Sequence, residues 1–463
     1  MERIRDAFLT LLRAGLWEDQ AQDTASCLQD QCFPLSAEEW SDVLLMARSQ
    51  TVIGLVFSGI SRLPDELMPQ PEQLALWAAE TDGLERRNRG MNAVLTEFAG
   101  KFIGAGLHPV LQKGQGVARL YAQPLLRRSG DIDLFFPEPG ENAKALELIR
   151  KEGIQINAAA DGSHCYRYRN VIVEHHPDLL DICRPAAKRK IGEEIRRFGY
   201  VGSGIVPGLR VPHPALNLLL LSTHILKHAM GKGIGLRQLC DYARACFVYS
   251  GGNSGHKDGC SGMPEATQDL WPEMARIYRE AGVTEWTNLL HSFVTEYLGL
   301  PPECTGGTVA ETGISGDGDS AANSDRVAGT GGAIWKYTDP SPLMKIVESG
   351  GNFGQYAGLG KRRTGTPAST PASAAAASGK EPAQTAQTAT AQIAQIAQTA
   401  QIAQIAQTAQ IAQPPLKAHT GKLHTAMAFV KRFGFSFRYA PGEAVWQCLT
   451  LIRGQFSSKK HLK

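Results

Sequence analysis

The stretch that decides the fold is residues 109–136, PVLQKGQGVARLYAQPLLRRSGDIDLFF. Its first residues are apolar and β-prone, and Lys113-Gly114 then turns the chain into GQGVARLY, which has helical character. After a polar, proline-containing turn, Asp-Ile-Asp-Leu-Phe-Phe predicts a second strand. The sequence therefore predicts a strand, a glycine turn, a short helix and a return strand that carries two acidic residues.

The two acidic residues, Asp131 and Asp133, are the strongest chemical signal in the chain. Side chains alternate along a strand, so both carboxylates project from one face with Cα atoms roughly 7 Å apart. Two ionised carboxylates at that separation repel each other unless a divalent cation lies between them. The pattern therefore favours a metal site. The alternative is structural: Asp131 caps a turn, and Asp133 pairs with Arg127 or Arg128.

Further residues follow in a recognisable order: Lys113-Gly114, Tyr121, Pro124, Arg127 or Arg128, Asp131-Ile132-Asp133, and later Glu174 with His176. This order resembles the nucleotidyltransferase superfamily that includes DNA polymerase β, and within it an uncharacterised bacterial nucleotidyltransferase family. The resemblance runs from about residue 40 to about residue 301. It implies an α+β fold with an α/β core, in which helices flank a mixed sheet. One departure is that Lys-Gly replaces the superfamily's usual Gly-Ser turn.

The resemblance also implies the roles of individual residues. Asp131, Asp133 and Glu174 become the catalytic carboxylates and the ligands of Mg²⁺ or Mn²⁺. The predicted contacts to ATP or another nucleoside triphosphate are Lys113, Gly114, Arg127 and Arg128. The predicted substrate-cleft candidates are Tyr121, His176, His224, His228, Arg237 and Asp241.

Several of these residues also have structural interpretations. Lys113 alternatively caps a strand end. His224 and His228 are four residues apart, the spacing of a metal-binding pair, but a polar contact at the rim of the cleft is the simpler interpretation. Arg237 and Asp241 have the spacing of a helix salt bridge.

Three function classes fit these residues. The first is transfer of a nucleoside monophosphate from a nucleoside triphosphate to a hydroxyl- or phosphate-bearing acceptor: a small molecule, a sugar or a protein. The second is a catalytically inactive nucleotidyltransferase-fold protein that binds a partner. The third is a DHH-like metal phosphoesterase, suggested by Asp-x-Asp followed by Glu-His-His, although Glu replaces the Asp of that signature.

The composition of the chain bears on its partners and on its cellular compartment. A net charge of +3 carries no strong nucleic-acid signal. The nine cysteines are scattered without a CxxC pair, which indicates a reducing compartment. The N-terminus lacks the pattern of a signal peptide, and the longest apolar run, LNLLLLSTHIL, is shorter than a membrane span. We therefore expect a cytoplasmic protein.

The pattern of helices, strands and biased composition divides the chain into seven segments. They are an N-terminal helical region (1–107), the catalytic core (108–200), a helical substrate-cleft domain (201–301), a Gly/Ser-rich linker (302–333), a short ordered segment (334–360), an Ala/Gln/Thr/Ile low-complexity repeat (361–417) and a C-terminal helical tail (418–463). The helix expected up to residue 106 should pack on the sheet. Its Arg86, Arg87 and Arg89 run fits a solvated face better than a phosphate-binding patch. The tail regains aromatic residues and is expected to dock back on the catalytic region.

The repeat AQIAQIAQTAQIAQIAQTAQIAQ has a period of three residues. On an α-helix each repeat advances about 300°, so the apolar stripe drifts by roughly 60° per repeat and no face stays buried. The period does not match a strand either. We assign the tract no catalytic role.

Excising residues 381–413 should therefore leave the melting temperature and activity nearly unchanged. The entropic cost of closing a loop grows only with the logarithm of its length, so a shorter connection should change stability little. Thermal unfolding of the full-length and shortened chains tests this expectation. A large fall in melting temperature would show that the tract docks on the folded part.

Overall fold

A mixed sheet of seven strands lies at the centre of the structure. The structure is a computed structural model, and it describes residues 2–17, 32–159, 161–231, 233–252, 270–305, 335–350 and 432–457. The strands are β1 (Val110–Leu111), β2 (Ile132–Phe135), β3 (Ile156–Ala158), β4 (His164–Tyr168), β5 (Val171–His176), β6 (Tyr200–Gly202) and β7 (Arg210–Pro212). Their order across the sheet is β3-β4-β5-β2-β1-β7-β6. The pairs β2–β5 and β1–β7 are parallel and the other pairs are antiparallel. This confirms the expected α+β fold with a mixed sheet.

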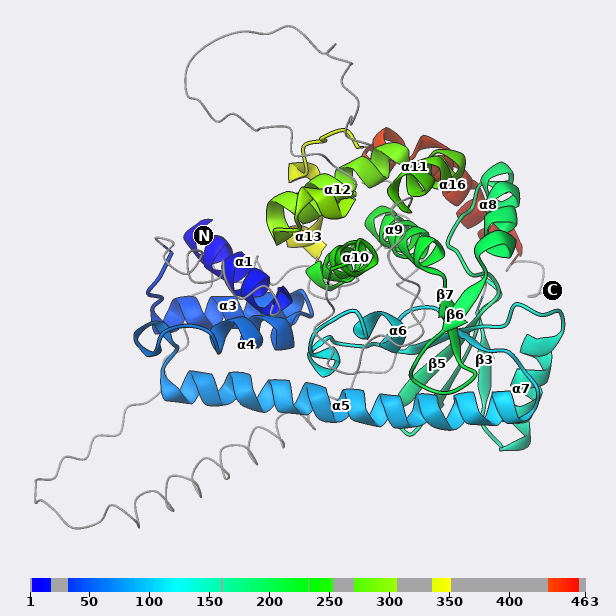
Figure 1. Cartoon of the computed structure of the whole chain (residues 1–463), viewed down its shortest axis with the longest axis horizontal. Coiled ribbons are helices and arrows are strands. Elements are labelled where there is room, and N and C mark those ends of the chain that lie inside the picture. The colour runs from blue at the N-terminus through cyan, green and yellow to red at the C-terminus, as the bar shows by residue number, and fades with distance from the viewer. Residues whose placement is uncertain are drawn as a thin grey trace, which may run out of the picture.

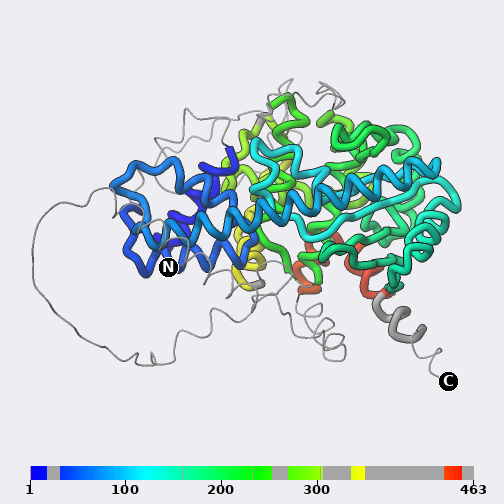
Figure 2. The backbone as a smooth tube through the Cα atoms, turned by 90° about the horizontal axis from the view of Figure 1, so that it is seen from below, coloured from blue at the N-terminus to red at the C-terminus, as the bar shows by residue number. Residues whose placement is uncertain are grey.

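One face of the sheet is covered by α5 (Pro71–Gly104), the long helix that runs the length of the molecule in Figures 1 and 2. Its buried residues, among them Phe98 and Phe102, share a core with Val171 and Val173 of β5. The helix α7 (Glu141–Lys151) adds buried apolar residues to the same core. The packing of the long helix on the sheet is therefore confirmed.

The β-prone sequences HCYRYRN and VIVEHH, which meet at an asparagine, predict a hairpin, and the structure contains it. β4 and β5 pair in antiparallel register, and the turn residues Arg169 and Asn170 have φ of 46° and 65°. Positive φ at both central positions is the geometry of a tight two-residue hairpin, which asparagine tolerates well. This turn fixes the register of β5, the strand that carries Glu174.

An N-terminal helical layer lies at one end of α5 (Figure 2). It comprises α1 (Glu2–Leu16), α3 (Ala37–Ser49), α4 (Ile53–Ile60) and the 3₁₀ turn η1 (Asp65–Leu67). The helices α1 and α4 lie so close that a Cβ on Gly59 would be 2.0 Å from the carbonyl oxygen of Leu11. Only glycine permits that approach. Gln50 then joins this layer to α13 (Ser341–Gly350) by donating to the carbonyl of Val347 at 3.0 Å.

A second helical region covers the other side of the sheet. Its elements are α8 (Pro185–Phe198), α9 (Pro214–Met230), α10 (Leu236–Tyr249), α11 (Leu270–Ala281), α12 (Thr284–Leu298) and the 3₁₀ turn η3 (Pro302–Thr305). Most of α9 is buried, which explains why its sequence is apolar on nearly all sides. The indole of Trp286 donates to the carbonyl of Ser222 at 2.9 Å and so fixes α12 against α9.

The C-terminal tail docks back on this region, as expected. The helical residues 432–439 and α16 (Pro441–Ser457) contribute Tyr439, Ala440 and Ala444 to the main core. The buried carboxylate of Glu443 accepts hydrogen bonds from the backbone N–H groups of Cys183 at 2.7 Å and Arg184 at 3.1 Å. The tail therefore holds the segment that leads into α8.

Two expected segment boundaries differ from the structure. The core was expected to end at residue 200, but the sheet continues to Pro212 because β6 and β7 extend it beside β1. Residues 302–305, assigned to the linker, form η3. The rest of the linker and the whole repeat lie outside the described residues. Among the described residues, no helix has both the length and the apolar character needed to cross a bilayer.

Glu443→Gln should lower the free energy of unfolding by about 1–3 kcal/mol. A neutral amide keeps the shape of the side chain but turns one acceptor oxygen into a donor that faces an N–H group. Urea unfolding, with Glu285→Gln on the exposed first turn of α12 as the matched control, measures the difference. Equal stability of the two variants would mean that Glu443 does not anchor the tail.

Candidate metal centre and its surroundings

The parallel pairing of β2 with β5 brings the candidate metal ligands together. Asp133 lies directly beside Glu174 in this register, and His176 follows two residues later on the same face. One ligand atom from each of these three residues lies within 4.8 Å of the others. The side chains on the opposite face of the two strands belong to the core under α5. Successive residues of β5 therefore face the core and the candidate site in turn.

Asp133 is buried and already has two partners in this cluster. The Nε2 atom of His176 lies 2.7 Å from its Oδ1 atom, and the ammonium of Lys113 lies 3.3 Å from the same oxygen. Burial by itself would raise the pKa of Asp133, but Lys113 and the hydrogen bond from His176 lower that pKa far below its usual range. Asp133 is therefore ionised, and Lys113 is its counterion.

Asp131 behaves differently from Asp133. The negative charge of Asp133, followed by burial, raises the pKa of Asp131 to about 6. Asp131 is not one of the three residues whose ligand atoms group within 4.8 Å. The group within 4.8 Å therefore contains two of the three expected carboxylates and the imidazole of His176, and the charge of Asp133 disfavours ionisation of Asp131.

The glycine turn before α6 (Gln115–Ala118) holds Lys113 close to these carboxylates. Gly114 has φ of 58° and ψ of −118°, and a Cβ at this position would lie 3.1 Å from the carbonyl oxygen of Asp131. Both the positive φ and the close approach require glycine. This turn explains why Lys-Gly occurs here: it lets the chain reverse against the start of β2 while the lysine side chain reaches Asp133.

The structural alternative for the aspartates is wrong in its choice of partner. Arg127 donates to both carboxylate oxygens of Asp241, at 2.8 and 2.7 Å, and the hydroxyl of Tyr121 donates to the same carboxylate at 2.7 Å. All three side chains are buried. Burial and Asp241 also raise the pKa of Tyr121 well above its usual value.

Two expectations about this cluster therefore need correction. Arg127 was expected to contact nucleotide, but its guanidinium is occupied in the protein interior and its third nitrogen donates to Ser129 at 3.0 Å. The suggested helix salt bridge between Arg237 and Asp241 gives way to the Arg127–Asp241 pair. The cluster joins the residues on both sides of η2 (Pro124–Leu126) to α10, so it is a structural connection under the site.

Arg237 and Arg128 remain at the site. Arg237 donates to the carbonyl of Arg128 at 3.1 Å, and its buried Nε atom has no hydrogen-bond partner among the described residues. Burial, followed by the charge of Arg127, lowers the pKa of Arg237. Arg128 is exposed beside it. Arg237 also interacts electrostatically with Asp131, so it is a second cation at the edge of the metal cluster.

The arginine run on α5 is mainly a solvated face, as expected. Arg86 and Arg89 form exposed ion pairs with Asp82 and Glu85 one turn earlier. Arg87 differs, because it donates to the carbonyl of Gly130 at 3.1 Å, next to Asp131.

Asp181 is a residue of this region that the sequence analysis did not identify. Its carboxylate lies 2.9 Å from Nδ1 of His224 and 2.7 Å from the ammonium of Lys227. The ring of His228 stands edge-on to that of His224, with centroids 4.4 Å apart. The paired histidines therefore make polar and ring contacts. The only sequence signal for Asp181 was its place shortly after Glu174 and His176 in EHHPDLLD.

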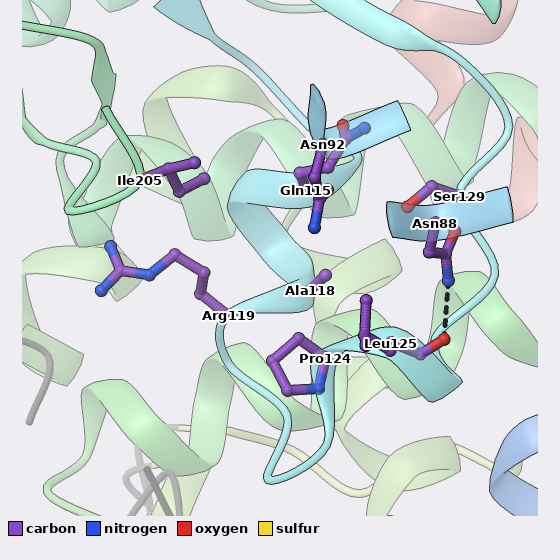
Figure 3. Close-up of a pocket in the computed structure, with 9 residues that line it drawn as sticks. All are labelled: Asn88, Asn92, Gln115, Ala118, Arg119, Pro124, Leu125, Ser129 and Ile205. Carbon is purple, nitrogen blue, oxygen red and sulfur yellow. Dashed lines mark hydrogen bonds between the residues drawn. The ribbon is translucent and has the colours of Figure 1, made fainter. Parts of the chain in front are cut away.

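A small cavity of about 60 Å³ lies between α5, α6 and η2 (Figure 3). None of its lining residues belongs to the metal cluster. Gln115 lines it, and neither atom of its buried side-chain amide has a protein partner among the described residues. Asn88, on the α5 side, donates to the carbonyls of Leu125 at 2.7 Å and Arg127 at 2.9 Å. The cavity has the size and polarity to hold several waters behind the turn.

Residues 36–251 match the model of a protein family described as uncharacterised nucleotidyltransferase. This region of the chain is therefore similar to a nucleotidyltransferase family. The matched residues of the family extend from α3 to α10, and so include the whole sheet, the metal cluster, Asp181 and His224. No curated protein and no solved structure matches the chain.

Asp131→Asn and Asp133→Asn should change stability in opposite directions in chelator-treated protein at pH 8. The pKa of Asp131 is raised in the folded state. Its contribution to stability is therefore fully present below its unfolded-state pKa near 3.8 and is lost as the pH rises through about 6. Asp131→Asn should thus raise the free energy of unfolding at pH 8 by on the order of 1 kcal/mol and have little effect near pH 4.

The pKa of Asp133 is lowered in the folded state, so its carboxylate contributes to the stability of the fold above its unfolded-state pKa. Asp133→Asn should therefore lower the free energy of unfolding at pH 8. Urea unfolding at both pH values measures the two effects, with the exposed Asp65→Asn as the control. Destabilisation by Asp131→Asn at pH 8 would instead support a turn-capping role for Asp131.

Proposed function

We propose that the protein transfers a nucleoside monophosphate from a nucleoside triphosphate to a hydroxyl- or phosphate-bearing acceptor, with Mg²⁺ or Mn²⁺. The observation that carries the proposal is the grouping of Asp133, Glu174 and His176 within 4.8 Å, beside Lys113, in a region that matches a nucleotidyltransferase family. Acceptors that fit are small molecules, sugars and protein side chains.

The donor set suits a hard divalent cation. Asp133 and Glu174 supply carboxylate oxygens, the ligands that Mg²⁺ and Mn²⁺ prefer, and Asp131 stands next to them as a further carboxylate. His176 donates to Asp133, so its role in this proposal is to orient that carboxylate. Such a cation, when bound, neutralises triphosphate charge and lowers the pKa of an acceptor hydroxyl.

The cations of the chain bind the triphosphate. Lys113 is held between Asp133 and the glycine turn, and nearby carboxylates keep its pKa raised although burial alone would lower it. It is therefore charged at neutral pH and close to the place where the phosphates lie. Arg237, whose Nε lacks a protein partner among the described residues, and the exposed Arg128 complete a cationic edge. This edge replaces the expected contact from Arg127.

A second candidate function is binding without catalysis. The observation that favours it is that Lys113 and His176 already neutralise Asp133, so the cluster has no strict need for a cation. The phosphoesterase interpretation has no comparable support in the geometry.

A thermal-shift screen with each nucleoside triphosphate, in Mg²⁺ or Mn²⁺ and in chelator, tests the proposal. We expect stabilisation by at least one metal–nucleotide combination, because a ligand that binds the folded state at 100 times its Kd stabilises it by about 2.7 kcal/mol. Release of pyrophosphate with any hydroxyl acceptor then separates catalysis from binding alone. Absence of stabilisation by all combinations would contradict nucleotide binding.

Lys113→Ala should weaken binding of the stabilising nucleotide by about tenfold or more, because one buried charge-assisted contact contributes about 1.5–3 kcal/mol. Isothermal titration measures the affinity, and Lys188→Ala, a lysine exposed beside Asp178, is the control. Unchanged affinity would mean that Lys113 serves only as the counterion of Asp133.

A further inference from the structure

The segment that leaves β5 carries Asp181 to the end of β1, where Lys113 lies. Gln112, the neighbour of Lys113, donates from Nε2 to the carbonyls of Asp178 at 2.8 Å and Leu179 at 3.1 Å. Two residues after Asp181, the backbone is held by Glu443 of the tail. The position of Asp181 is thus fixed from both sides, next to the strand end that supplies Lys113.

Asp181 orients one histidine. Its Oδ2 atom lies 2.9 Å from Nδ1 of His224, and its Oδ1 atom accepts from Lys227 at 2.7 Å. Burial alone would raise the pKa of Asp181, but the hydrogen bond from His224 and the neighbouring cations lower it well below its usual range. An ionised carboxylate only accepts hydrogen bonds, so Nδ1 of His224 carries the proton. The Nε2 atom is left with a lone pair that can take a proton.

We propose that Asp181 and His224 form a proton-accepting pair that deprotonates the acceptor hydroxyl in the transfer reaction. This inference rests on the proposed function. The proton of the acceptor O–H moves to Nε2 of His224 while the acceptor oxygen bonds to the α-phosphorus. The bond from that phosphorus to the bridging oxygen breaks, and pyrophosphate leaves with the electron pair. Asp181 stabilises the imidazolium that forms.

The charges around His224 suit this role. Burial, followed by the charge of Lys113, lowers the pKa of His224 to about 4, so the imidazole is neutral at pH 7. The other groups that act on it or contact it are Asp181, Asp133 and His228, and Lys227 pairs with the same Asp181. A bound triphosphate would offset the positive charge of Lys113. Nucleotide binding should therefore raise the pKa of His224 toward neutrality, where a general base works best.

The first test is independent of turnover. In ¹⁵N-histidine-labelled full-length protein at pH 7.5, the resonances absent from His224→Gln identify His224. We expect a neutral ring with its proton on Nδ1, and an upward shift of its pKa by at least one unit when Mg²⁺ and a non-hydrolysable triphosphate analogue are added. A proton on Nε2, or a ring that is charged without nucleotide, overturns the proposal.

The second test measures transfer from each α-³²P-labelled nucleoside triphosphate with Mg²⁺ or Mn²⁺, with water and glycerol as the acceptor hydroxyls. His224→Gln and Asp181→Asn should each lower kcat by about 100-fold or more and leave the KM for nucleotide within threefold, because general base catalysis contributes about 10²–10⁴-fold. A smaller loss of kcat, or a loss that resides in KM, overturns the proposal.

His108→Gln is the matched control. Its Nδ1 atom also pairs with a carboxylate, that of Glu141 at 2.7 Å, but it precedes β1 at the end opposite Lys113. This variant should keep the wild-type kcat. The two hypotheses fail separately: absence of metal–nucleotide binding by the wild type removes the proposed function, whereas full activity of His224→Gln removes only the proton-accepting pair.

Discussion

The parallel pairing of β2 with β5 is the constraint on which the site depends. It places two carboxylates, on Asp133 and Glu174, side by side on one face of the sheet. Like charges at that distance repel, so the pairing is tolerated only because cationic and hydrogen-bonding groups surround it. The opposite face of the same strands supplies apolar side chains to the core under α5. Stability of the fold and charge density at the site therefore come from alternate residues of the same two strands.

Lys113 is the group that makes this charge density compatible with folding. Its ammonium lies 3.3 Å from Asp133 and also lowers the pKa of Asp181, so one cation serves two carboxylates. The glycine turn brings it there, because Gly114 adopts a positive φ against the start of β2. A nucleotide that draws Lys113 toward its phosphates would release charge on Asp133 at the moment when a metal ion is needed. Nucleotide and metal binding would then support each other.

The helical region and the tail hold this arrangement from the far side. The buried Arg127–Asp241 pair ties the turn before β2 to α10, and Glu443 ties the segment after Asp181 to the tail. A buried charge pair is costly when one partner is lost, since the other is left uncompensated. The site therefore depends on residues that are distant in the sequence, and the tail, although it lies outside the matched family region, contributes to the segment that positions Asp181 and His224.

The sequence by itself determined the local elements: the Asp-x-Asp strand, the Lys-Gly turn, the hairpin with an asparagine turn and the long helix on the sheet. These follow from alternation, turn chemistry and helical periodicity, which act over a few residues. Family resemblance also suggested Glu174 as a partner of the aspartates, and the register of β2 with β5 places it beside Asp133. The tertiary structure alone decided which charges meet. Arg127 pairs with Asp241 and not with an aspartate of β2, and His176, not Asp131, lies within 4.8 Å of both Asp133 and Glu174. Asp181, His224 and Glu443 come together only because separate segments pack side by side, and no local pattern in a single sequence encodes such partners.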